Sequence, residues 1–306
     1  MAMPEIKKRA QIALKQGMVR LSRGRAPQST ERPVFIIGSG RSGNTLVRRT
    51  LMASGEIYIP PETYVLGEII EKWARGATLP WRERVWLFCA YFEKHPHFST
   101  FGVDNLNGFA DDAANWPKQD QTLRHLIDGF YRFMGQEHGY GAKRWGEKSP
   151  WNTFHLPAIA AFFPDAQFLW LVRDGRDAAL SYCEAGLYES FPNAAKRWTR
   201  ANEACVKLSE TQSDLRRVNY EDLVTDPETV FAETFAWLGL PFTPDMLNAQ
   251  AGRMGDVEAL AHHKNVRNPI SAASIGRWKS RVSAEDLKSA GPEFTAMLRQ
   301  LGYDAS

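Results

Sequence analysis

The chain has 306 residues, of which 43% are hydrophobic and 24% charged, so it has the composition of a globular protein and can bury a full core. Its three cysteines are an odd number, which argues against a disulfide framework and favours a reducing compartment, and they lack the spacing of a zinc site. No run approaches the roughly 20 apolar residues of a membrane span, and the N-terminus lacks the apolar core of a secretory signal. We therefore expect a cytoplasmic protein with no metal ion and no nucleic-acid partner.

The N-terminal tail, residues 1–31, carries most of the basic charge. Residues 5–25 hold seven Lys or Arg against Glu5, a local charge of +6 within a total of +3, which leaves −3 for the remaining residues. Apolar residues recur in this segment at helical spacing, namely Ile6, Ala10, Ala13, Leu14, Met18 and Leu21. The pattern predicts a basic amphipathic helix, which either packs on its own domain or makes weak contact with an anionic membrane surface.

Two strand–loop–helix units follow the tail. Residues 34–37 are a short apolar run that stops at a glycine-rich turn, and a helical pattern follows over 46–51. The second unit has an apolar strand over 167–172 and a helix over 178–185. Two buried strands that each lead into a helix predict a parallel sheet.

The rest of the chain adds helices to this sheet. Residues 62–140 form a helical insertion rich in aromatic residues, which we expect to lie mostly in the core and to wall a substrate pocket on one side. A strand over 214–220, a helix from Pro227 to Gly239 and a loop over 262–280 complete the pattern. No internal repeat is visible, so we predict one elaborated α/β domain over 1–306.

The glycine-rich turn from Gly38 to Thr45 has the spacing of a Walker A loop, but Asn44 stands where that motif has its lysine. The lysine reaches the β- and γ-phosphates of a nucleoside triphosphate. The remaining glycines and the helix N-terminus still supply backbone N–H groups for an anion. We therefore predict an anion site that does not take ATP with magnesium, formed by Gly40, Arg41, Ser42, Gly43, Asn44, Thr45 and Leu46.

Four separate blocks of the chain resemble the superfamily of sulfotransferases that use 3′-phosphoadenosine 5′-phosphosulfate (PAPS). The segment Gly40-Arg41-Ser42-Gly43-Asn44-Thr45-Leu46 is similar to the family's Pro-Arg-Ser-Gly-Thr-Thr-Leu loop for the 5′-phosphosulfate. Arg173, and Ser181 eight residues later, resemble its 3′-phosphate motif, in which Arg supplies a charged fork and Ser a hydroxyl. Tyr220 lies in a Tyr-Glu-x-Leu segment, and Arg277 and Lys279 lie in a late Gly-x-Trp-Lys segment like that of the loop that closes over the cofactor.

The resemblance implies both a fold and a reaction. The fold is a P-loop-like three-layer α/β architecture, with a central parallel sheet flanked by helices and the helical insertion. The reaction transfers a sulfuryl group from PAPS to an acceptor hydroxyl and leaves adenosine 3′,5′-bisphosphate (PAP). It requires no metal ion, because one sulfuryl group carries less charge than a γ-phosphate.

The resemblance also names the catalytic candidates. Glu62, in Pro60-Pro61-Glu62-Thr63-Tyr64, is similar to the Glu-Thr segment that carries the base in tyrosylprotein and related bacterial sulfotransferases; the alternative is a carboxylate in the first turn of a helix. Lys148 stands where the family places a lysine on the transferring or bridging oxygen, and its alternative is a surface lysine at a strand end. Arg41 is the second candidate cation.

Histidine is the weaker candidate for the base. Cytosolic small-molecule sulfotransferases use a histidine within a Lys-Thr-His segment, whereas Ser149 and Pro150 follow Lys148 here. The usual pKa of histidine makes any such residue eligible, His155 included, but a lone histidine is more often structural. His262 and His263 adjoin the late loop.

Two other functional classes remain open. A P-loop kinase in which Lys148 or Arg41 replaces the missing charge predicts binding of ATP with magnesium. A non-catalytic anion-binding or membrane-peripheral module keeps the loop and the tail and leaves Glu62 idle. The acceptor, whether small molecule, carbohydrate, lipid or peptide, and the oligomeric state carry no recognisable motif.

Overall fold

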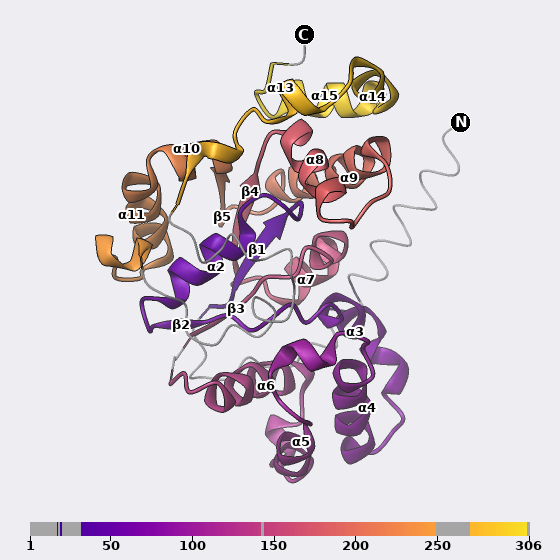
Figure 1. Cartoon of the computed structure of the whole chain (residues 1–306). Coiled ribbons are helices and arrows are strands. Elements are labelled where there is room, and N and C mark those ends of the chain that lie inside the picture. Colours follow the sequence, from indigo (N-terminus) through magenta and orange to yellow (C-terminus); the bar gives the residue numbers. More distant parts are fainter. Residues whose placement is uncertain (1–16, 18, 20–31, 142–143, 249–269, 305–306) are drawn as a thin grey trace. The chain divides into compact units, whose positions relative to one another are not determined.

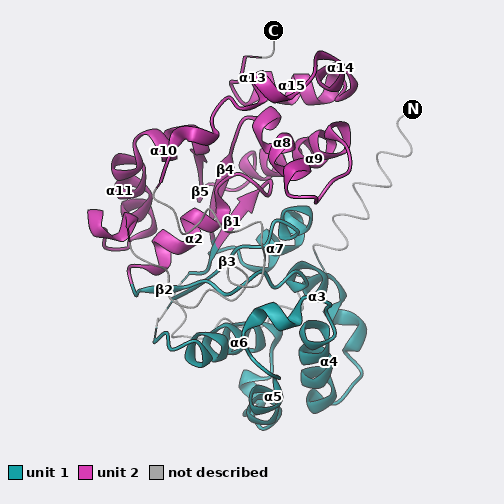
Figure 2. Cartoon of the chain, in the orientation of Figure 1, with its two compact units in different colours: residues 1–34, 55–166 teal, residues 35–54, 167–306 magenta. Residues whose placement is uncertain are grey.

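The computed structural model describes residues 17, 19, 32–141, 144–248 and 270–304 (Figure 1). The predicted basic helix, except for residues 17 and 19, and both His262 and His263 lie outside these residues. The chain falls into two compact units (Figure 2), the first made of residues 1–34 and 55–166 and the second of residues 35–54 and 167–306. The single domain over 1–306 stays a prediction.

Five strands form one sheet in the order β2-β3-β1-β4-β5. They are β1 (Val34–Gly38), β2 (Ile57–Tyr58), β3 (Arg144–Glu147), β4 (Gln167–Val172) and β5 (Leu215–Asn219). In the first unit β2 pairs with β3, and in the second β4 pairs with β5, both in parallel. The parallel pairing confirms the predicted parallel sheet, and β4 is buried along its whole length, as strands covered on both faces are.

The first unit holds the predicted helical insertion, and aromatic residues form its core. The rings of Phe92 and Phe130 stack at a centroid distance of 4.2 Å, and both side chains are fully buried. Trp86 and Tyr91 depart from the prediction of buried aromatics, with 49% and 37% exposure. The helices of this unit are α3 (Leu66–Lys72), η1 (Trp73–Gly76), α4 (Trp81–Glu93), η2 (Phe98–Phe101), α5 (Asn107–Ala114), η3 (Lys118–Asp120), α6 (Leu123–Glu137), η4 (Asn152–His155) and α7 (Leu156–Phe162).

Capping residues set the bounds of the helices in the second unit. The Asp174 side chain accepts from the Arg176 N–H at the start of α8, and α11 ends at Gly239 with a left-handed φ of 72°, as predicted. The late loop of the prediction contains a short helix, α13. The helices are α2 (Asn44–Met52), α8 (Gly175–Glu184), α9 (Phe191–Ser209), α10 (Tyr220–Thr225), α11 (Pro227–Leu238), η5 (Pro244–Leu247), η7 (Ala272–Ser274), α13 (Trp278–Arg281), α14 (Ala284–Ser289) and α15 (Pro292–Gln300).

Candidate active site

The glycine-rich loop joins β1 to α2 in the second unit and is packed against two tyrosines. A Cβ atom added at Gly40 would lie 2.5 Å from the Tyr182 hydroxyl, and one added at Gly43 would lie 2.8 Å from a ring carbon of Tyr220. Gly43 also has a φ of 88°, which favours glycine. Both glycines therefore allow close packing, and Gly43 is also favoured by the turn.

The polar groups of the loop are arranged for an anion. The Ser42 side chain is fully buried, and its hydroxyl has no hydrogen-bond partner among the described residues. A buried hydroxyl without a partner costs free energy, so its position fits a loop that donates to a bound phosphate or sulfate oxygen. Asn44 instead ties the loop together, because its side-chain amide donates to the Ser39 carbonyl at 3.2 Å. Thr45 and Leu46 lie in the first turn of α2, whose N–H groups lack intrahelical partners.

The two predicted phosphate motifs contact each other directly. Arg41 Nε donates to the Ser181 hydroxyl at 3.1 Å, and Arg173 Nη1 donates to the Arg41 carbonyl at 2.9 Å. Arg41 has a left-handed φ of 67°, which is uncommon for a residue other than glycine and occurs at functional sites. The second unit therefore brings the loop, the end of β4 and the helix α8 into one basic cluster.

Tyr220 and Ser274 extend this cluster. The Arg173 guanidinium lies 4.5 Å from the centroid of the Tyr220 ring, and Nη2 donates to the Ser274 carbonyl at 2.7 Å. The hydroxyls of Tyr220 and Ser274 share a hydrogen bond of 2.7 Å. Arg173 is only 5% exposed, and its Nε has no partner within the described part of the chain. Stacking and two carbonyl contacts thus hold a buried cation in a fixed orientation.

The two late cations of the prediction are placed differently. Arg277 donates to Glu184 Oε1 at 2.7 Å, and Arg281 donates to the same oxygen at 2.8 Å. The backbone N–H of Lys279 donates to the Gly276 carbonyl at 3.2 Å, whereas its side chain makes no hydrogen bond or ion pair within the described residues. The structure therefore brings Arg41, Arg173, Ser181 and Tyr220 together and leaves Arg277 paired with a carboxylate of α8.

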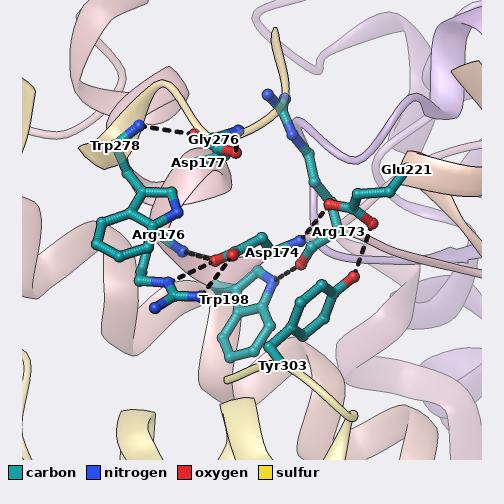
Figure 3. A network of polar contacts seen from close by, with 9 residues as sticks. All are labelled: Arg173, Asp174, Arg176, Asp177, Trp198, Glu221, Gly276, Trp278 and Tyr303. Carbon is teal, nitrogen blue, oxygen red and sulfur yellow. Dashed lines mark hydrogen bonds and ion pairs between the residues drawn. The ribbon is translucent and has the colours of Figure 1, made fainter. Parts of the chain in front are cut away.

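A polar network holds the turn that carries Arg173 (Figure 3). The Trp198 indole N–H donates to the Arg173 carbonyl at 3.1 Å, and the Asp174 N–H donates to Glu221 Oε1 at 2.9 Å. The other oxygen of Glu221 accepts from the Tyr303 hydroxyl at 2.8 Å. Burial raises the pKa of Glu221, and burial next to Glu221 raises the pKa of Tyr303. Residues far apart in the sequence thus fix the end of β4.

In the first unit, the two predicted catalytic residues form an ion pair. Lys148 Nζ donates to Glu62 Oε1 at 2.7 Å, and the side chains are 1% and 16% exposed respectively. The alternative of a surface lysine is therefore wrong. The alternative of a helix first-turn carboxylate is also wrong, because α3 begins only at Leu66.

The buried carboxylate of Glu147 connects the two segments that carry this ion pair. Glu147, next to Lys148, is 1% exposed and accepts from Tyr131 at 2.7 Å and from Thr63 and Asn152 at 3.0 Å each. Burial raises its pKa, and the hydrogen bonds that it accepts oppose this shift. Because Thr63 adjoins Glu62 and Glu147 adjoins Lys148, the same two segments are joined once by the ion pair and once by this hydrogen bond.

Ser149 adds a third connection. Its hydroxyl accepts the backbone N–H of Thr63 at 2.9 Å and of Tyr64 at 3.3 Å. Tyr64 has a φ of 60°, and its ring stacks on His95 at 4.7 Å. The backbone around Glu62 is therefore held on both sides.

His155 does not join this pair. It lies in η4, and its Nδ1 is 3.0 Å from Glu71 Oε1. The His155 side chain packs directly against Gly67, since a Cβ atom added at Gly67 would lie 2.4 Å from His155 Cβ and 2.5 Å from its Cγ. This is the structural role that a lone histidine more often has.

Several supporting residues escaped the sequence analysis. Ser149, Tyr303 and Trp198 carry no local signal, because their partners lie far away in the sequence. Glu147 gave a usable signal, since a carboxylate at the end of a buried strand must find hydrogen-bond donors. Asp177, in the same turn as Arg173, was visible as a second acidic residue in Arg-Asp-Gly-Arg-Asp.

Known proteins similar to this chain are sulfotransferases. Protein-tyrosine sulfotransferase 1 of Danio rerio is 26% identical over 89% of this chain and 72% of its own length. Protein-tyrosine sulfotransferase 2 of Gallus gallus is 24% identical over 90% of this chain and 71% of its own length. The human protein-tyrosine sulfotransferase 1 is 26% identical over 89% of this chain and 69% of its own length.

Two solved structures share the fold. The sulfotransferase domain of the olefin synthase of Synechococcus PCC 7002 has a TM-score of 0.65 at 21% identity, and the match covers 92% of this chain and 98% of that domain. The sulfotransferase domain of the curacin biosynthetic pathway has a TM-score of 0.64 at 23% identity, and the match covers 90% of this chain and 99% of that domain. The predicted P-loop-like α/β architecture is confirmed.

The expected cytoplasmic location is contradicted by these relatives, since protein-tyrosine sulfotransferases are enzymes of the Golgi membrane. Cysteine count and hydropathy misled the prediction, because a globular catalytic domain has much the same composition on either side of a membrane. Among the described residues, no helix is both long and apolar enough to cross a bilayer.

The model of the sulfotransferase family matches residues 33–244. This range contains the glycine-rich loop, the Glu62–Lys148 pair, and the segment from Arg173 to Tyr220. The family, the relatives and the fold together identify an enzyme that transfers a sulfuryl group. The chain belongs to the sulfotransferase family.

Proposed function

We propose that the sulfuryl donor is PAPS and that the second unit binds its nucleotide. The observation that carries this proposal is the direct contact between Arg41 of the loop and Ser181 of α8 at 3.1 Å. A ligand with two phosphate groups needs two anion sites close together, and Arg173 supplies a further buried cation. The loop residues Gly40 to Leu46 would hold the 5′-phosphosulfate, and Arg173 and Ser181 the 3′-phosphate. Tyr220, Arg277 and Lys279 complete the proposed nucleotide contacts.

We assign the transfer itself to the pair in the first unit. Glu62 makes no hydrogen bond other than that with Lys148 in the described part of the chain, so its Oε2 is available to take the acceptor proton. The acceptor oxygen then bonds to sulfur as the bond between sulfur and the bridging phosphate oxygen breaks, and PAP leaves. Lys148 and Arg41 stabilise the charge that develops on the bridging oxygen. These cations make a metal ion unnecessary in the proposed reaction.

Calorimetry distinguishes this function from the two alternatives, a P-loop kinase and a non-catalytic anion-binding module. We expect PAP to bind in a buffer that contains a chelator, and ATP with magnesium to bind more weakly. Preference for ATP with magnesium would favour the kinase, whereas PAP binding without transfer to any acceptor would favour the non-catalytic module. Incubation with labelled PAPS and a cell extract, followed by mass spectrometry, tests for the hydroxyl acceptor. The names of the relatives make a tyrosine-containing peptide the first acceptor to try.

Replacement of Arg173 tests the 3′-phosphate site. We expect Arg173→Ala to weaken PAP binding by about 1.5–3 kcal/mol, the usual contribution of a hydrogen bond to a charged group. Arg216→Ala is a suitable control, since Arg216 is an arginine of the same unit that pairs with Glu233 on the surface. Equal PAP affinity in the Arg173 variant and the wild type, measured by calorimetry, would remove Arg173 from the site.

A further inference from the structure

Among the described residues, one buried carboxylate of the second unit accepts hydrogen bonds only from the backbone of a distant segment. The Gly276 N–H donates to Asp177 Oδ2 at 2.6 Å, and the Trp278 N–H donates to Asp177 Oδ1 at 2.9 Å (Figure 3). Asp177 is 2% exposed and lies in the first turn of α8, where the helix dipole stabilises its charge. Each oxygen thus accepts from a different peptide of the same turn, and charge-assisted bonds of this kind are stronger than neutral ones.

The conformation of Gly276 makes this arrangement possible. Its φ is 70°, in the left-handed region that favours glycine. The turn directs the N–H groups of Gly276 and Trp278 to one carboxylate, and Arg277 lies between these two residues in the sequence. Asp177 therefore sets the position of Arg277 and of the α13 residues that follow it, including Lys279.

A second contact fixes the same turn. The Arg176 guanidinium lies 3.8 Å from the centroid of the Trp278 ring, and the Asp174 carboxylate holds that guanidinium through bonds of 3.0 and 2.8 Å. Asp174 also belongs to the network that orients Arg173. The turn that carries the proposed 3′-phosphate cation and the turn at Gly276 are thus tied together by adjacent residues of α8.

On the N-terminal side of Gly276, Ser274 contacts the basic cluster through Arg173 and Tyr220. Ser274 bonds to Arg173 through its carbonyl and to Tyr220 through its hydroxyl, both at 2.7 Å. A loss of the Asp177 bonds would therefore weaken the hold on Ser274 as well as on Arg277 and Lys279.

We propose that Asp177 is a positioning residue for nucleotide binding, which fastens residues 274–279 to α8 and so places Ser274, Arg277 and Lys279 for PAPS. The inference rests on the proposed function. Asp177 itself touches no part of the nucleotide in this proposal, because both of its oxygens are engaged by the backbone. Its effect on affinity must therefore pass through the segment that it holds.

A double-mutant cycle tests this dependence. We expect Asp177→Ala to weaken PAP binding about tenfold, the lower range for loss of charge-assisted hydrogen bonds. In a protein that already carries Arg277→Ala and Lys279→Ala, we expect the same substitution to have a clearly smaller effect. Asp177→Asn retains one acceptor oxygen and should fall between the wild type and Asp177→Ala. A tenfold loss in both backgrounds would overturn the proposal, as would unchanged affinity in Asp177→Ala.

Hydrogen exchange supplies a readout that does not need the nucleotide. Without ligand, the amides of residues 274–281 should exchange faster in Asp177→Ala, while those of β4 keep their protection. Asp226→Ala is the matched control, because Asp226 also accepts a backbone N–H but caps α11; neither PAP affinity nor exchange at 274–281 should change in it. If the wild type fails to bind PAP, the proposed function fails, and exchange still decides whether Asp177 holds the segment. Unchanged exchange in Asp177→Ala would overturn the anchoring.

Discussion

Glu62→Gln is expected to lower the turnover number by about 10²- to 10⁴-fold, the range typical of a lost general base. The amide keeps the shape of the side chain and an oxygen for the Lys148 ammonium, which lies 2.7 Å from Glu62 Oε1. It cannot accept the proton of the acceptor hydroxyl. Because the residues that we propose for nucleotide binding lie in the second unit, PAP affinity should stay unchanged. Single-turnover transfer from PAPS and PAP calorimetry measure the two quantities separately.

Glu68→Gln is the matched control for this variant. Glu68 forms an ion pair with Lys72 within α3, in the same unit as Glu62, and its side chain is 44% exposed. Surface pairs of this kind contribute little, so transfer in this variant should match the wild type. If transfer in Glu62→Gln is as fast as in the wild type, Glu62 is not the base, and His155 becomes the next residue to test.

Lys148→Met should have the second largest effect, a fall in turnover of about 10²- to 10³-fold, as is usual when one donor to a developing anion is removed. Methionine keeps the length of the apolar stem and removes only the ammonium group. Lys148 is 1% exposed, so water cannot easily replace its charge. A change in the rate of transfer without a matching change in PAP affinity would show that the ammonium acts on the transition state.

The double variant of Glu62 and Lys148 shows whether the two residues act as a unit. Because they contact each other, we expect the double variant to lose much less than the product of the two single losses. Fully additive losses would mean that the ion pair has no part in the transfer. Lys72→Met, the counterpart in the surface pair, should leave the rate unchanged.

The strands and helices around the glycine-rich loop were predictable because local sequence determines them. The apolar run of β1, the glycines after it and the capping residues of α8 each act over a few residues. Arg173 and Ser181 were named from the family resemblance, and their closeness could be foreseen because one strand–turn–helix unit contains both. The ion pair between Glu62 and Lys148 was named as two residues but not as a pair, because the contact spans 86 positions.

The supporting contacts could not be predicted. Asp177 reads locally as an ordinary acidic residue in a helix first turn, and only the fold shows that it serves the backbone of Gly276. Tyr303 likewise acquires its role from Glu221, 82 positions away. Burial was also misjudged at Trp86, where a hydrophobic residue lies on the outer face of α4. Such features depend on tertiary packing, which composition and periodicity do not encode.

The second unit is built from two pieces of chain, residues 35–54 and 167–306, separated by the whole of residues 55–166. During synthesis the glycine-rich loop therefore leaves the ribosome long before Arg173, Ser274 and Tyr303 exist. The first unit, apart from its N-terminal piece, is continuous and can begin to fold as it emerges. The contacts around Arg173, by contrast, are complete only after Ser274 and Tyr303 have been made. Contacts of such long sequence separation form slowly. We therefore expect the proposed nucleotide site to be completed only after residues 274–303 have been made.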